Sequence, residues 1–426
     1  MNTFENIIGY ETIKTELRQI CDMIHNKEIY TALGAKLPQG VLLYGDPGLG
    51  KTLMAKCFIE ESGLPSYTIR RNKGTDDFVG EITAAFGKAK ENAPAIVFLD
   101  DMDKFANEDE DRRDAEEYVA IQSGIDEVKG CDVFVLGTVN NMRKLPSSLK
   151  RSGRFDRKIE VCSPSPDDAF EIIKHYLKDK KIADDLNLED IAMMIQYSSC
   201  AELETILNEA AIRAGYARHE NITMKDMVDA VLRMEYEAPD SFTKTSEEDM
   251  RKTALHEAGH LVICEVLCQG SIGLASLRSS GRDQVGGFVR RCKELTRRPF
   301  DILVSLGGKA AVELYYSDTH ASGCHTDIKR AAEQIRTAIT ESCVSGFGYM
   351  DIENHFTPAM SENLNSRNEA VVHAELERYL FKARDILLKN KEFLEKATNA
   401  LIEKETLLHS DIKALRESSS IVEVVV

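Results

Sequence analysis

The sequence of 426 residues lacks both a long apolar run and a secretory leader. A membrane-spanning helix needs about 20 nearly continuous apolar residues, and the longest uninterrupted runs here, such as Ala95 to Leu99, reach only about five. The first residues, Met1 to Asn6, carry neither the basic nor the apolar part of a signal peptide. These absences predict a soluble, cytoplasmic chain that reaches a membrane only through a partner.

The sequence also has fewer basic than acidic residues. The sequence has 54 Lys and Arg residues against 71 Asp and Glu, which gives a formal net charge of −17. Nucleic acids and anionic membrane surfaces are bound by clustered basic residues, so the composition argues against both as partners. Ten cysteines without a secretory signal favour free thiols in a reducing compartment.

Two regions of different pattern follow one another along the chain. In the first, short apolar runs at 40–44, 95–99 and 132–136 alternate with helical stretches, which is typical of buried parallel strands covered by helices. The second region is mostly helical. We expect an α/β domain at 1–162, a helical domain at 163–235, a polar linker at 236–248, a mainly helical domain at 249–420 and an apolar tail at 421–426.

The segment Gly45 to Thr52 reads GDPGLGKT and fits the phosphate-loop pattern G-x-x-x-x-G-K-T. It follows an expected strand and precedes a helical stretch, which is the context the pattern requires. We expect Lys51 to neutralise the β- and γ-phosphates of a nucleotide and the Thr52 hydroxyl to bind Mg²⁺. The residues expected to contact the nucleotide here are Gly45, Asp46, Pro47, Gly48, Leu49, Gly50, Lys51, Thr52 and Leu53.

Polar residues follow the next two apolar strands. The strand at 95–99 ends in Asp100 and Asp101, and the strand after it leads to Asn140. Beside a phosphate loop, an acidic strand end is the Walker B arrangement. Asp100 is expected to hold Mg²⁺ through water, Asp101 to polarise the attacking water, and Asn140 to contact the γ-phosphate or that water.

Two arginines three residues apart, Arg151 and Arg154, lie in the segment RSGRFDR. Because the phosphate loop already has Lys51, we expect both arginines to act on the nucleotide of a neighbouring subunit in a ring. A basic surface turn is the alternative. The acidic run at 107–117 is interpreted as a solvated loop or helix start, with a partner site as the alternative.

A helix expected at 249–268 contains the pattern H-E-x-x-H, with His256, Glu257 and His260. Residues four apart lie on one helical face, so the two imidazoles can share one Zn²⁺. Glu257 can then take a proton from the zinc-bound water, whose pKa the metal lowers. Two histidines without a metal are the alternative.

A zinc hydrolase needs a third protein ligand. The metzincin extension is excluded, because Ile263 and Val266 occupy its positions. Spacing leaves open six candidates: Glu294, Glu313, Asp318, His320, His325 and Asp327. Asp327 is expected at the start of an amphipathic helix over 328–342. Cys264 and Cys268 continue the helical face of His260 and could form a second thiolate site or a Cys–His pair, although buried thiols are commoner.

Taken together, these residues resemble the FtsH-type ATP-dependent zinc metalloproteases, which join an AAA ATPase to a zincin-like peptidase. The resemblance runs from FENIIG at 4–9 to about Leu415, and it includes GGKAAVE at 307–313 and SGCHTDI at 322–328. It implies an AAA+ α/β domain with a parallel sheet and a small helical lid, then a mainly α-helical zinc metallopeptidase domain.

The resemblance also implies roles for individual residues. It selects Asp327 as the third zinc ligand and Asn140 as sensor 1, and it matches Ile8 and Gly9 to the backbone that contacts adenine. Two segments have counterparts as well: 284–289 resembles an edge strand that pairs with substrate, and 78–80 resembles the aromatic-Val-Gly pore loop.

The mechanism implied by the resemblance is that of a homohexameric ring. Such a ring hydrolyses ATP with Mg²⁺, pulls in unfolded or misfolded protein substrates and cleaves them in a zinc chamber. The sequence departs from the family at Asp46, where proline is usual, at Asp101, where Glu is usual, and at 78–86, which is shorter. The transmembrane helices with which the family begins do not occur in these 426 residues.

Two alternatives remain at this point. The chain could be a non-proteolytic unfoldase or remodelling ATPase with a structural or vestigial zinc site. It could also be an ATP-independent metallopeptidase with a weak ATPase used only for assembly, an alternative motivated by Asp46 and Asp101.

Overall fold

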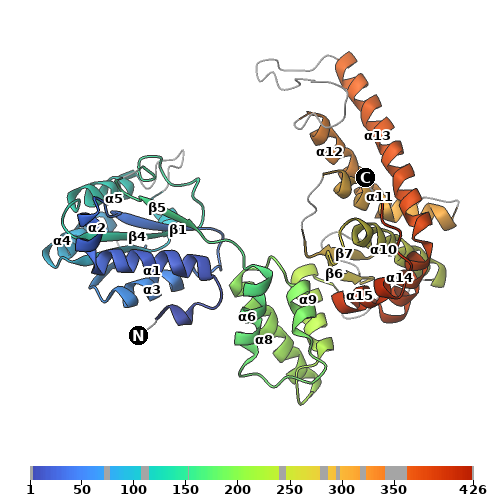
Figure 1. Cartoon of the computed structure of the whole chain (residues 1–426), viewed down its shortest axis with the longest axis horizontal. Coiled ribbons are helices and arrows are strands. Elements are labelled where there is room, and N and C mark those ends of the chain that lie inside the picture. Colours follow the sequence, from blue (N-terminus) through green and yellow to red (C-terminus); the bar gives the residue numbers. More distant parts are fainter. Residues whose placement is uncertain are drawn as a thin grey trace. The chain divides into compact units, whose positions relative to one another are not determined.

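A computed structural model describes residues 3–71, 77–106, 115–151, 153–238, 246–278, 286–293, 298–316, 323–340 and 362–424, with the backbone alone at 115, 298, 323, 339–340 and 362–368. The chain forms two compact units. Met1–Lys180 and Tyr197–Asn208 make up the first, and Lys181–Gln196 and Glu209–Val426 make up the second. Figure 1 labels the helices and strands of both.

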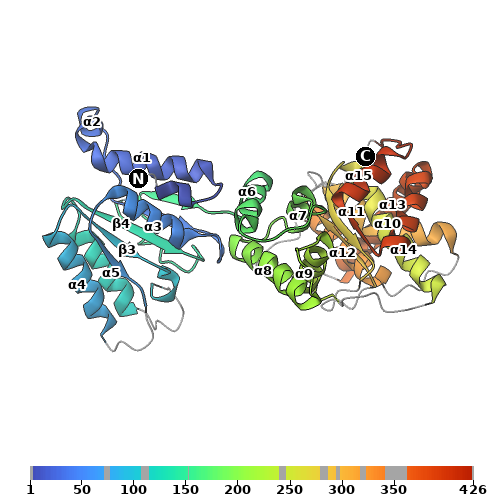
Figure 2. The same cartoon turned by 90° about the horizontal axis from the view of Figure 1, so that it is seen from below.

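The first unit is built on a five-stranded parallel sheet in the order β2-β3-β4-β1-β5. Figures 1 and 2 show α1 and α3 on one face of the sheet and α4 and α5 on the other. The strands are β1 (Gly40–Tyr44), β2 (Ser66–Ile69), β3 (Ala95–Leu99), β4 (Val133–Val139) and β5 (Arg157–Glu160). The helices are η1 (Thr3–Asn6), α1 (Glu11–His25), α2 (Lys27–Ala32), α3 (Lys51–Ser62), α4 (Phe78–Glu91), η2 (Met102–Lys104), α5 (Ala115–Glu127) and α6 (Pro166–Leu177).

Strands β1, β3 and β4 carry almost only buried apolar side chains, so both faces of the sheet are covered. The predicted parallel α/β architecture is therefore confirmed. Strand β4 continues beyond the apolar run at 132–136, because Gly137 and Val139 still pair with Leu42 and Tyr44 of β1. Since β1, β4 and β3 are parallel neighbours, the residues after them meet at one edge of the sheet.

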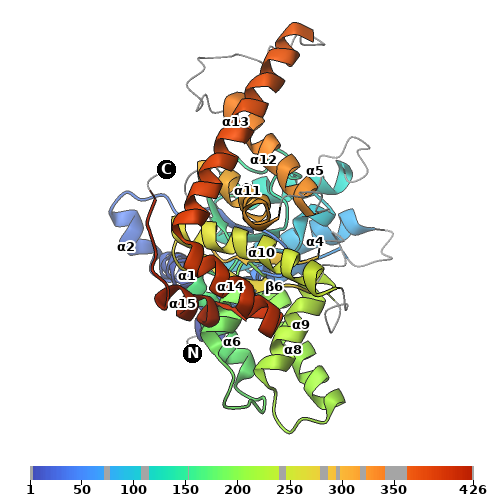
Figure 3. The same ribbon diagram turned by 90° about the vertical axis from the view of Figure 1, so that its right-hand side faces the viewer.

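The second unit is mainly helical, as predicted, with a small three-stranded antiparallel sheet in the order β7-β6-β8. Figure 3 shows α10 with α11 and α14 beside it and the long α13 rising next to them. The helices are α7 (Leu188–Met194), α9 (Met224–Tyr236), α10 (Glu247–Leu267), α11 (Arg298–Tyr315), α12 (Gly323–Thr340), α13 (Glu362–Lys389), α14 (Lys391–Lys404) and α15 (His409–Glu417), and the strands are β6 (Ile272–Ser276), β7 (Phe288–Arg291) and β8 (Thr406–Leu408).

Several predicted boundaries lie elsewhere in the structure. Helix α10 begins at Glu247 because Ser246 caps it through its side chain, and helix α12 begins at Gly323, so that Asp327 lies in its second turn and not at its start. Helix α8 (Cys200–Ala217) is shared between the two units, so the predicted helical domain at 163–235 does not coincide with either unit. That domain remains a prediction.

The pore-loop match at 78–80 is wrong. Phe78 is only 6% exposed, lies in the first turn of α4 and packs edge-on against Phe105 at 5.3 Å between ring centroids. An aromatic side chain that grips substrate must be exposed, and this one belongs to the apolar core of the first unit. Residues 107–114 of the acidic run, 239–245 of the linker, and Gln284 and Val285 of the edge strand lie outside the described residues.

None of the helices in the described part of the chain combines the length and the apolarity needed to cross a bilayer. At the other end of the chain, Ile421 and Val424 pack against the core of the second unit, and the backbone of Val422 is bonded to the buried Asn390 side chain at 2.8 and 3.2 Å. The described part of the tail is therefore docked.

Candidate functional site

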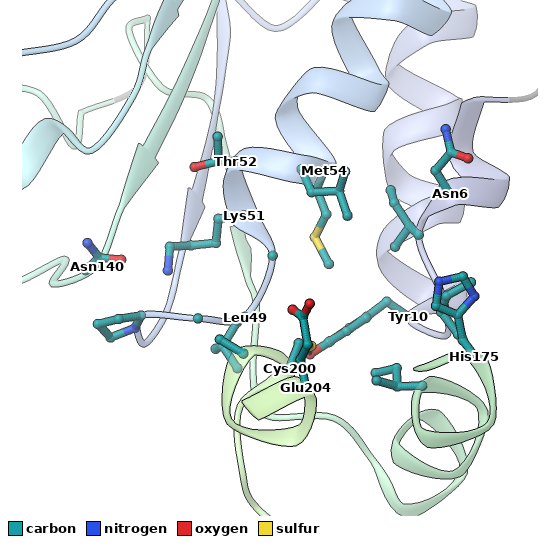
Figure 4. A pocket seen from close by; sticks show the side chains of 18 of the residues that line it. Asn6, Tyr10, Leu49, Lys51, Thr52, Met54, Asn140, His175, Cys200 and Glu204 are labelled. Atoms are coloured by element: carbon teal, nitrogen blue, oxygen red, sulfur yellow. Dashed lines mark hydrogen bonds between the residues drawn. The ribbon is translucent and has the colours of Figure 1, made fainter. Parts of the chain in front are cut away.

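A cavity of about 580 Å³ lies in the first unit, where the phosphate loop and the ends of the strands meet. In Figure 4, Lys51, Thr52 and Asn140 lie toward one side of it and Asn6 and His175 toward the other. The predicted nucleotide residues that line the cavity are Ile8, Pro47, Gly48, Leu49, Gly50, Lys51, Thr52, Leu53, Asp101 and Asn140. Gly9, Gly45, Asp46 and Asp100 are not among its lining residues.

The phosphate loop owes its shape to its glycines. Gly48 and Gly50 have φ angles of 80° and 86°, in the left-handed region that side chains other than glycine rarely adopt. Helix α3 starts at Lys51, within the loop segment, so its first N–H groups offer positive partial charge to an anion. The Lys51 ammonium donates to the carbonyl oxygens of Gly45 and Asp46 at 2.8 and 2.6 Å, which keeps it within the loop.

The end of β3 and the start of α3 bring together two oxygen groups suited to Mg²⁺, the Asp100 carboxylate and the Thr52 hydroxyl. Asp100 is buried, and its Oδ1 accepts hydrogen bonds from the hydroxyls of Thr52 and Thr138, both at 2.9 Å. Mg²⁺ prefers carboxylate, hydroxyl and water oxygens and usually keeps several waters. The adjacent Thr52 hydroxyl and Asp100 carboxylate therefore fit the ion that the sequence predicts.

Asp101 is held in an unusual backbone conformation at the mouth of this site. Its φ angle is 57°, its N–H donates to Thr138 Oγ1 at 2.8 Å, and its Oδ2 accepts from the Lys104 ammonium at 2.6 Å. The neighbouring Asn140 donates its backbone N–H to Asp103 at 3.1 Å and lines the cavity as expected. The carboxylate predicted to polarise water is thus engaged by a cation of its own chain.

Much of the cavity wall was not predicted. Helices α6 and α8 contribute His175 and Glu204 to the lining, and Tyr10 lines the cavity as well. Tyr10 donates its backbone N–H to Asp168 at 2.8 Å and its hydroxyl to the Cys162 carbonyl at 3.1 Å. The unpredicted lining residues are Asn6, Ile7, Tyr10, Met54, Lys104, Ile172, His175, Tyr176, Cys200, Ala201 and Glu204.

The two predicted trans-acting arginines differ in their surroundings. Arg154 is 14% exposed and binds its own chain, donating to Asp126 at 2.7 and 3.2 Å and to the Ser148 carbonyl at 2.6 Å. Hydrogen bonds from Arg154 and Lys129 hold the pKa of Asp126 at about 2. Arg151 is exposed. Neither arginine lines the cavity of its own chain.

A second site lies in the other unit, where two helices bring three ligand groups together. His256 and His260 of α10 meet Asp327 of α12: the Nε2 atoms lie 3.0 and 3.2 Å from Asp327 Oδ2 and 3.1 Å from each other. Ligand atoms about 2.0–2.1 Å from a tetrahedral Zn²⁺ are separated by about 3.3 Å, so this triangle fits the ion. The group His256, His260 and Asp327 is the one in the described residues that could hold a metal.

The ring orientations follow from the crossing of α10 and α11. A side chain at Gly259 would lie 2.3 Å from the carbonyl oxygen of Gly307, so the two backbones touch. This approach allows His260 Nδ1 to donate to the Val304 carbonyl at 2.6 Å, which leaves Nε2 facing Asp327. On the other side, the bare Cα of Gly308 lies against the His256 ring.

In this second site, the Asp327 carboxylate and the two histidines shift one another's pKa values. Burial lowers the pKa of His256, but the Asp327 carboxylate bonded to it raises the pKa above the ordinary histidine value. Burial alone would raise the pKa of Asp327. Hydrogen bonds from His256 and His260 have the larger, opposite effect and hold this pKa below its usual range. Burial raises the pKa of Glu257, which is 3% exposed and lies between the two histidines in sequence. A raised pKa makes Glu257 a stronger base.

A cleft of about 290 Å³ opens over these groups. Its lining includes His256, Glu257, His260 and Asp327 together with Phe288 and Val289 of the edge strand β7. Just before this strand, Gly287 lies so close to Glu257 that a side chain there would approach Glu257 Cγ to 2.8 Å. Strand β7 therefore lines the same cleft as Glu257, His256, His260 and Asp327, at the edge of the described sheet.

The other candidates for the third ligand lie elsewhere or outside the described residues. Glu313 forms ion pairs with Lys309 and Arg384, and His325 is exposed on α12. Glu294, Asp318 and His320 are outside the described residues. The thiolate alternative fails at Cys264, because burial raises the pKa of its thiol to about 12 and it is bonded to Ser271 at 3.1 Å.

Comparisons with known proteins match the two parts of the chain to two families. The family model "ATPase family associated with various cellular activities (AAA)" matches residues 41–163, and the model of peptidase family M41 matches residues 243–415. The "ATP-dependent zinc metalloprotease FtsH" of Streptobacillus moniliformis is 33% identical, over 99% of this chain and 65% of that protein.

Two further relatives extend the comparison. The FtsH protein of Leptotrichia buccalis is 31% identical over 97% of this chain and 56% of its own length, and FtsH 1 of Thermomicrobium roseum is 30% identical over 97% of this chain and 68% of its own length. The chain thus spans between 56% and 68% of these three relatives. By its motifs, its fold and the similarity to these relatives along nearly all of its own length, the chain belongs to the FtsH family of ATP-dependent zinc metalloproteases.

Proposed function

We propose that this chain is an ATP-dependent zinc endopeptidase that unfolds and degrades protein substrates. The observation that carries the proposal is the convergence of His256, His260 and Asp327, with the buried Glu257 beside them and an edge strand across the cleft. A structural zinc site closes its fourth position with a protein ligand, whereas a catalytic site keeps that position open. Three converging groups in an open cleft favour catalysis over a structural or vestigial site.

In the first unit, the proposed reaction is ATP hydrolysis. Lys51 and the N–H groups of the phosphate loop bind the phosphates, and Thr52 and Asp100 hold Mg²⁺. Asp101 orients the attacking water and Asn140 lies near the γ-phosphate. Tyr10, which precedes α1, and His175 of α6 flank the part of the cavity left for the nucleoside.

In the second unit, the proposed reaction is peptide-bond hydrolysis. Bound Zn²⁺ supplies Lewis-acid activation of water and of the peptide carbonyl. His256, His260 and Asp327 hold the ion, and the Val304 carbonyl fixes the tautomer of His260. Glu257 takes the proton of the attacking water at its carboxylate and delivers it to the leaving amine. The β7 edge holds the substrate backbone extended.

We propose that the chain assembles into a homo-oligomeric ring. The resemblance of its sequence to the family implies that this ring is a hexamer. Arg151 is exposed and suited to reach a neighbour's nucleotide, whereas Arg154 must first leave Asp126. The nine cysteines of the described residues are all free, as in a reducing compartment, which supports a cytoplasmic location. Sedimentation of the purified protein with ATP and Zn²⁺ tests the hexamer.

The function is tested by the degradation of an unfolded protein such as casein, with ATP and Zn²⁺ present. We expect degradation by the wild type, and its loss in Glu257→Gln with zinc content and ATP hydrolysis retained. If Glu257→Gln degrades casein at the wild-type rate, the peptidase assignment is wrong. Degradation that proceeds equally well without ATP would instead support an ATP-independent peptidase.

A further inference from the structure

A second lysine, Lys104, lies near the end of β3 in addition to Lys51 of the phosphate loop. Lys104 lies in the short helix η2, and its ammonium is 2.6 Å from Oδ2 of Asp101. The Lys104 side chain is 54% exposed and lines the nucleotide cavity together with Lys51 and Asn140. One ammonium therefore touches the carboxylate proposed to polarise water and also faces the space proposed for the phosphates.

The local fold explains why Lys104 points there. Asp101 is in the left-handed conformation, and the N–H of Lys104 donates back to the Asp101 carbonyl at 2.9 Å, which closes a tight turn. Met102, within the turn, and Phe105, directly after it, are fully buried. These apolar anchors fix the turn in the core, so the Lys104 side chain is directed away from it and over Asp101.

The turn lies among acidic side chains whose negative charge the Lys104 ammonium can offset. Four carboxylates act on the Lys51 ammonium: Asp101, Asp103, Asp46 and Asp100. Any triphosphate entering the cavity adds negative charge to these. Among the described residues, Lys104 and Arg70 also form ion pairs with these acids, the Arg70 guanidinium at 3.6 and 3.7 Å from Asp100 and Asp101. Of these two, Lys104 is the one that lines the cavity.

We propose that Lys104 is a further catalytic residue of ATP hydrolysis: its ammonium binds the γ-phosphate of ATP and thereby leaves the Asp101 carboxylate free for the attacking water. The inference rests on the proposed ATPase function. In the reaction, the water oxygen bonds to the γ-phosphorus while the bond from that phosphorus to the β–γ bridging oxygen breaks. ADP leaves with the bridging oxygen, a water proton passes to Asp101, and Lys104 exchanges no atom but neutralises the γ-phosphate oxygens.

The contact predicts a difference between ATP and ADP, because ADP has no γ-phosphate. The test compares the affinities of the full chain for ADP and for the non-hydrolysable analogue AMP-PNP, in the wild type, in Lys104→Met and in Lys104→Arg. A charge-assisted hydrogen bond is worth roughly tenfold to a hundredfold in affinity. We expect Lys104→Met to lose that factor for AMP-PNP with ADP affinity within about twofold of wild type, and to lose at least about tenfold in kcat. Lys104→Arg should recover most of both.

The matched control is Lys56→Met, an exposed lysine on α3 that does not line the cavity. It makes the same change of net charge and should leave both affinities unchanged. Two results would overturn the proposal. An equal loss of AMP-PNP and ADP affinity in Lys104→Met would mean that the lysine only supports the local fold. A rise in kcat with an unchanged affinity ratio would mean that Lys104 restrains Asp101 and does not bind the phosphate.

The affinity ratio also keeps this inference separate from the function on which it rests. It is measured without hydrolysis, so a wild-type protein that binds AMP-PNP more tightly than ADP but never turns over ATP would refute the proposed ATPase. In that protein, loss of the preference in Lys104→Met would still support the γ-phosphate contact, and its retention would refute it.

Discussion

Gly308 in α11 sets the position of His256, one of the three proposed zinc ligands. A Cβ added at this residue would lie 2.4 Å from Cε1, 2.5 Å from Nδ1 and 2.6 Å from Nε2 of His256. Ordinary van der Waals contact begins at 3.4 Å, so in Gly308→Ala the imidazole must move by about 1 Å. Ligand positions in metal sites tolerate deviations of about 0.2 Å. The substitution therefore acts on zinc binding far more than its single methyl group suggests.

The expected magnitudes follow from opposing effects. Alanine is favoured over glycine in a helix interior by about 1 kcal/mol, and displacing a packed side chain costs about 1–3 kcal/mol. The free energy of unfolding of the metal-free protein should thus fall by no more than about 2 kcal/mol. Zinc affinity should fall by about tenfold to a hundredfold, as it does when groups that orient a ligand are altered.

The assay is competition for Zn²⁺ with a chromophoric chelator, together with urea unfolding of the metal-free protein. Gly215→Ala on α8 is the matched control, because no atom outside its own helix lies within 4 Å of the added Cβ. It should stabilise the chain by up to about 1 kcal/mol without changing zinc affinity. A Gly308→Ala protein that binds zinc within twofold of wild type would refute the reasoning.

Three further predictions concern stability and reactivity. The pKa of Asp126 is about 2 in the fold and about 3.9 when unfolded, so its carboxylate stabilises the fold above pH 4 and loses this effect as pH falls toward 2. The loss of stability in Asp126→Asn, followed by urea midpoints at stepped pH, should accordingly shrink on acidification; a pH-independent difference would contradict the Arg154 pair. The buried Glu265 carboxylate accepts hydrogen bonds from three backbone N–H groups, those of Gly270, Ser271 and Ile272, at 2.8–3.1 Å. Glu265→Gln turns an amide donor toward at least one of these N–H groups. It should therefore lower the free energy of unfolding by about 1–3 kcal/mol, measured by urea unfolding. Thiol labelling of the native protein at pH 8 should modify the exposed Cys162 and spare Cys264, whose pKa burial raises to about 12; equal rates would show that Cys264 is accessible.

Features that depend on short sequence distances were predictable from the residues alone. The phosphate loop lies between a strand and a helix, as its pattern requires, and parallel pairing of β1, β4 and β3 gathers their ends at one edge of the sheet. That topology is why Asp101 and Asn140 line one cavity with Lys51. The two histidines of α10 share a face because they are four residues apart.

Features that depend on tertiary packing were not predictable in this way. Asp327 lies on α12, and a whole helix, α11, separates it from α10 in the sequence. Spacing from the histidines therefore left six candidates for the third ligand, and only the family resemblance selected Asp327 among them. The match at Phe78 failed because the same three residue types fit a buried helix start as well as an exposed loop. His175 and Glu204 belong to no motif, and they reach the cavity only because α6 and α8 pack beside the phosphate loop.

The glycines of the metal site show how packing completes what the zinc pattern begins. Glycine in a helix interior costs about 1 kcal/mol relative to alanine, yet α10 contains Gly259 and α11 contains Gly307. The two residues face each other so closely that a side chain on either would collide with the other's carbonyl oxygen, at 2.3 and 2.7 Å. Because the backbones touch there, the Val304 carbonyl comes within 2.6 Å of His260 Nδ1 and fixes the direction of its other nitrogen. The H-E-x-x-H spacing thus places the two proposed ligands His256 and His260 on one face, and the contact between two glycine-bearing helices orients His260.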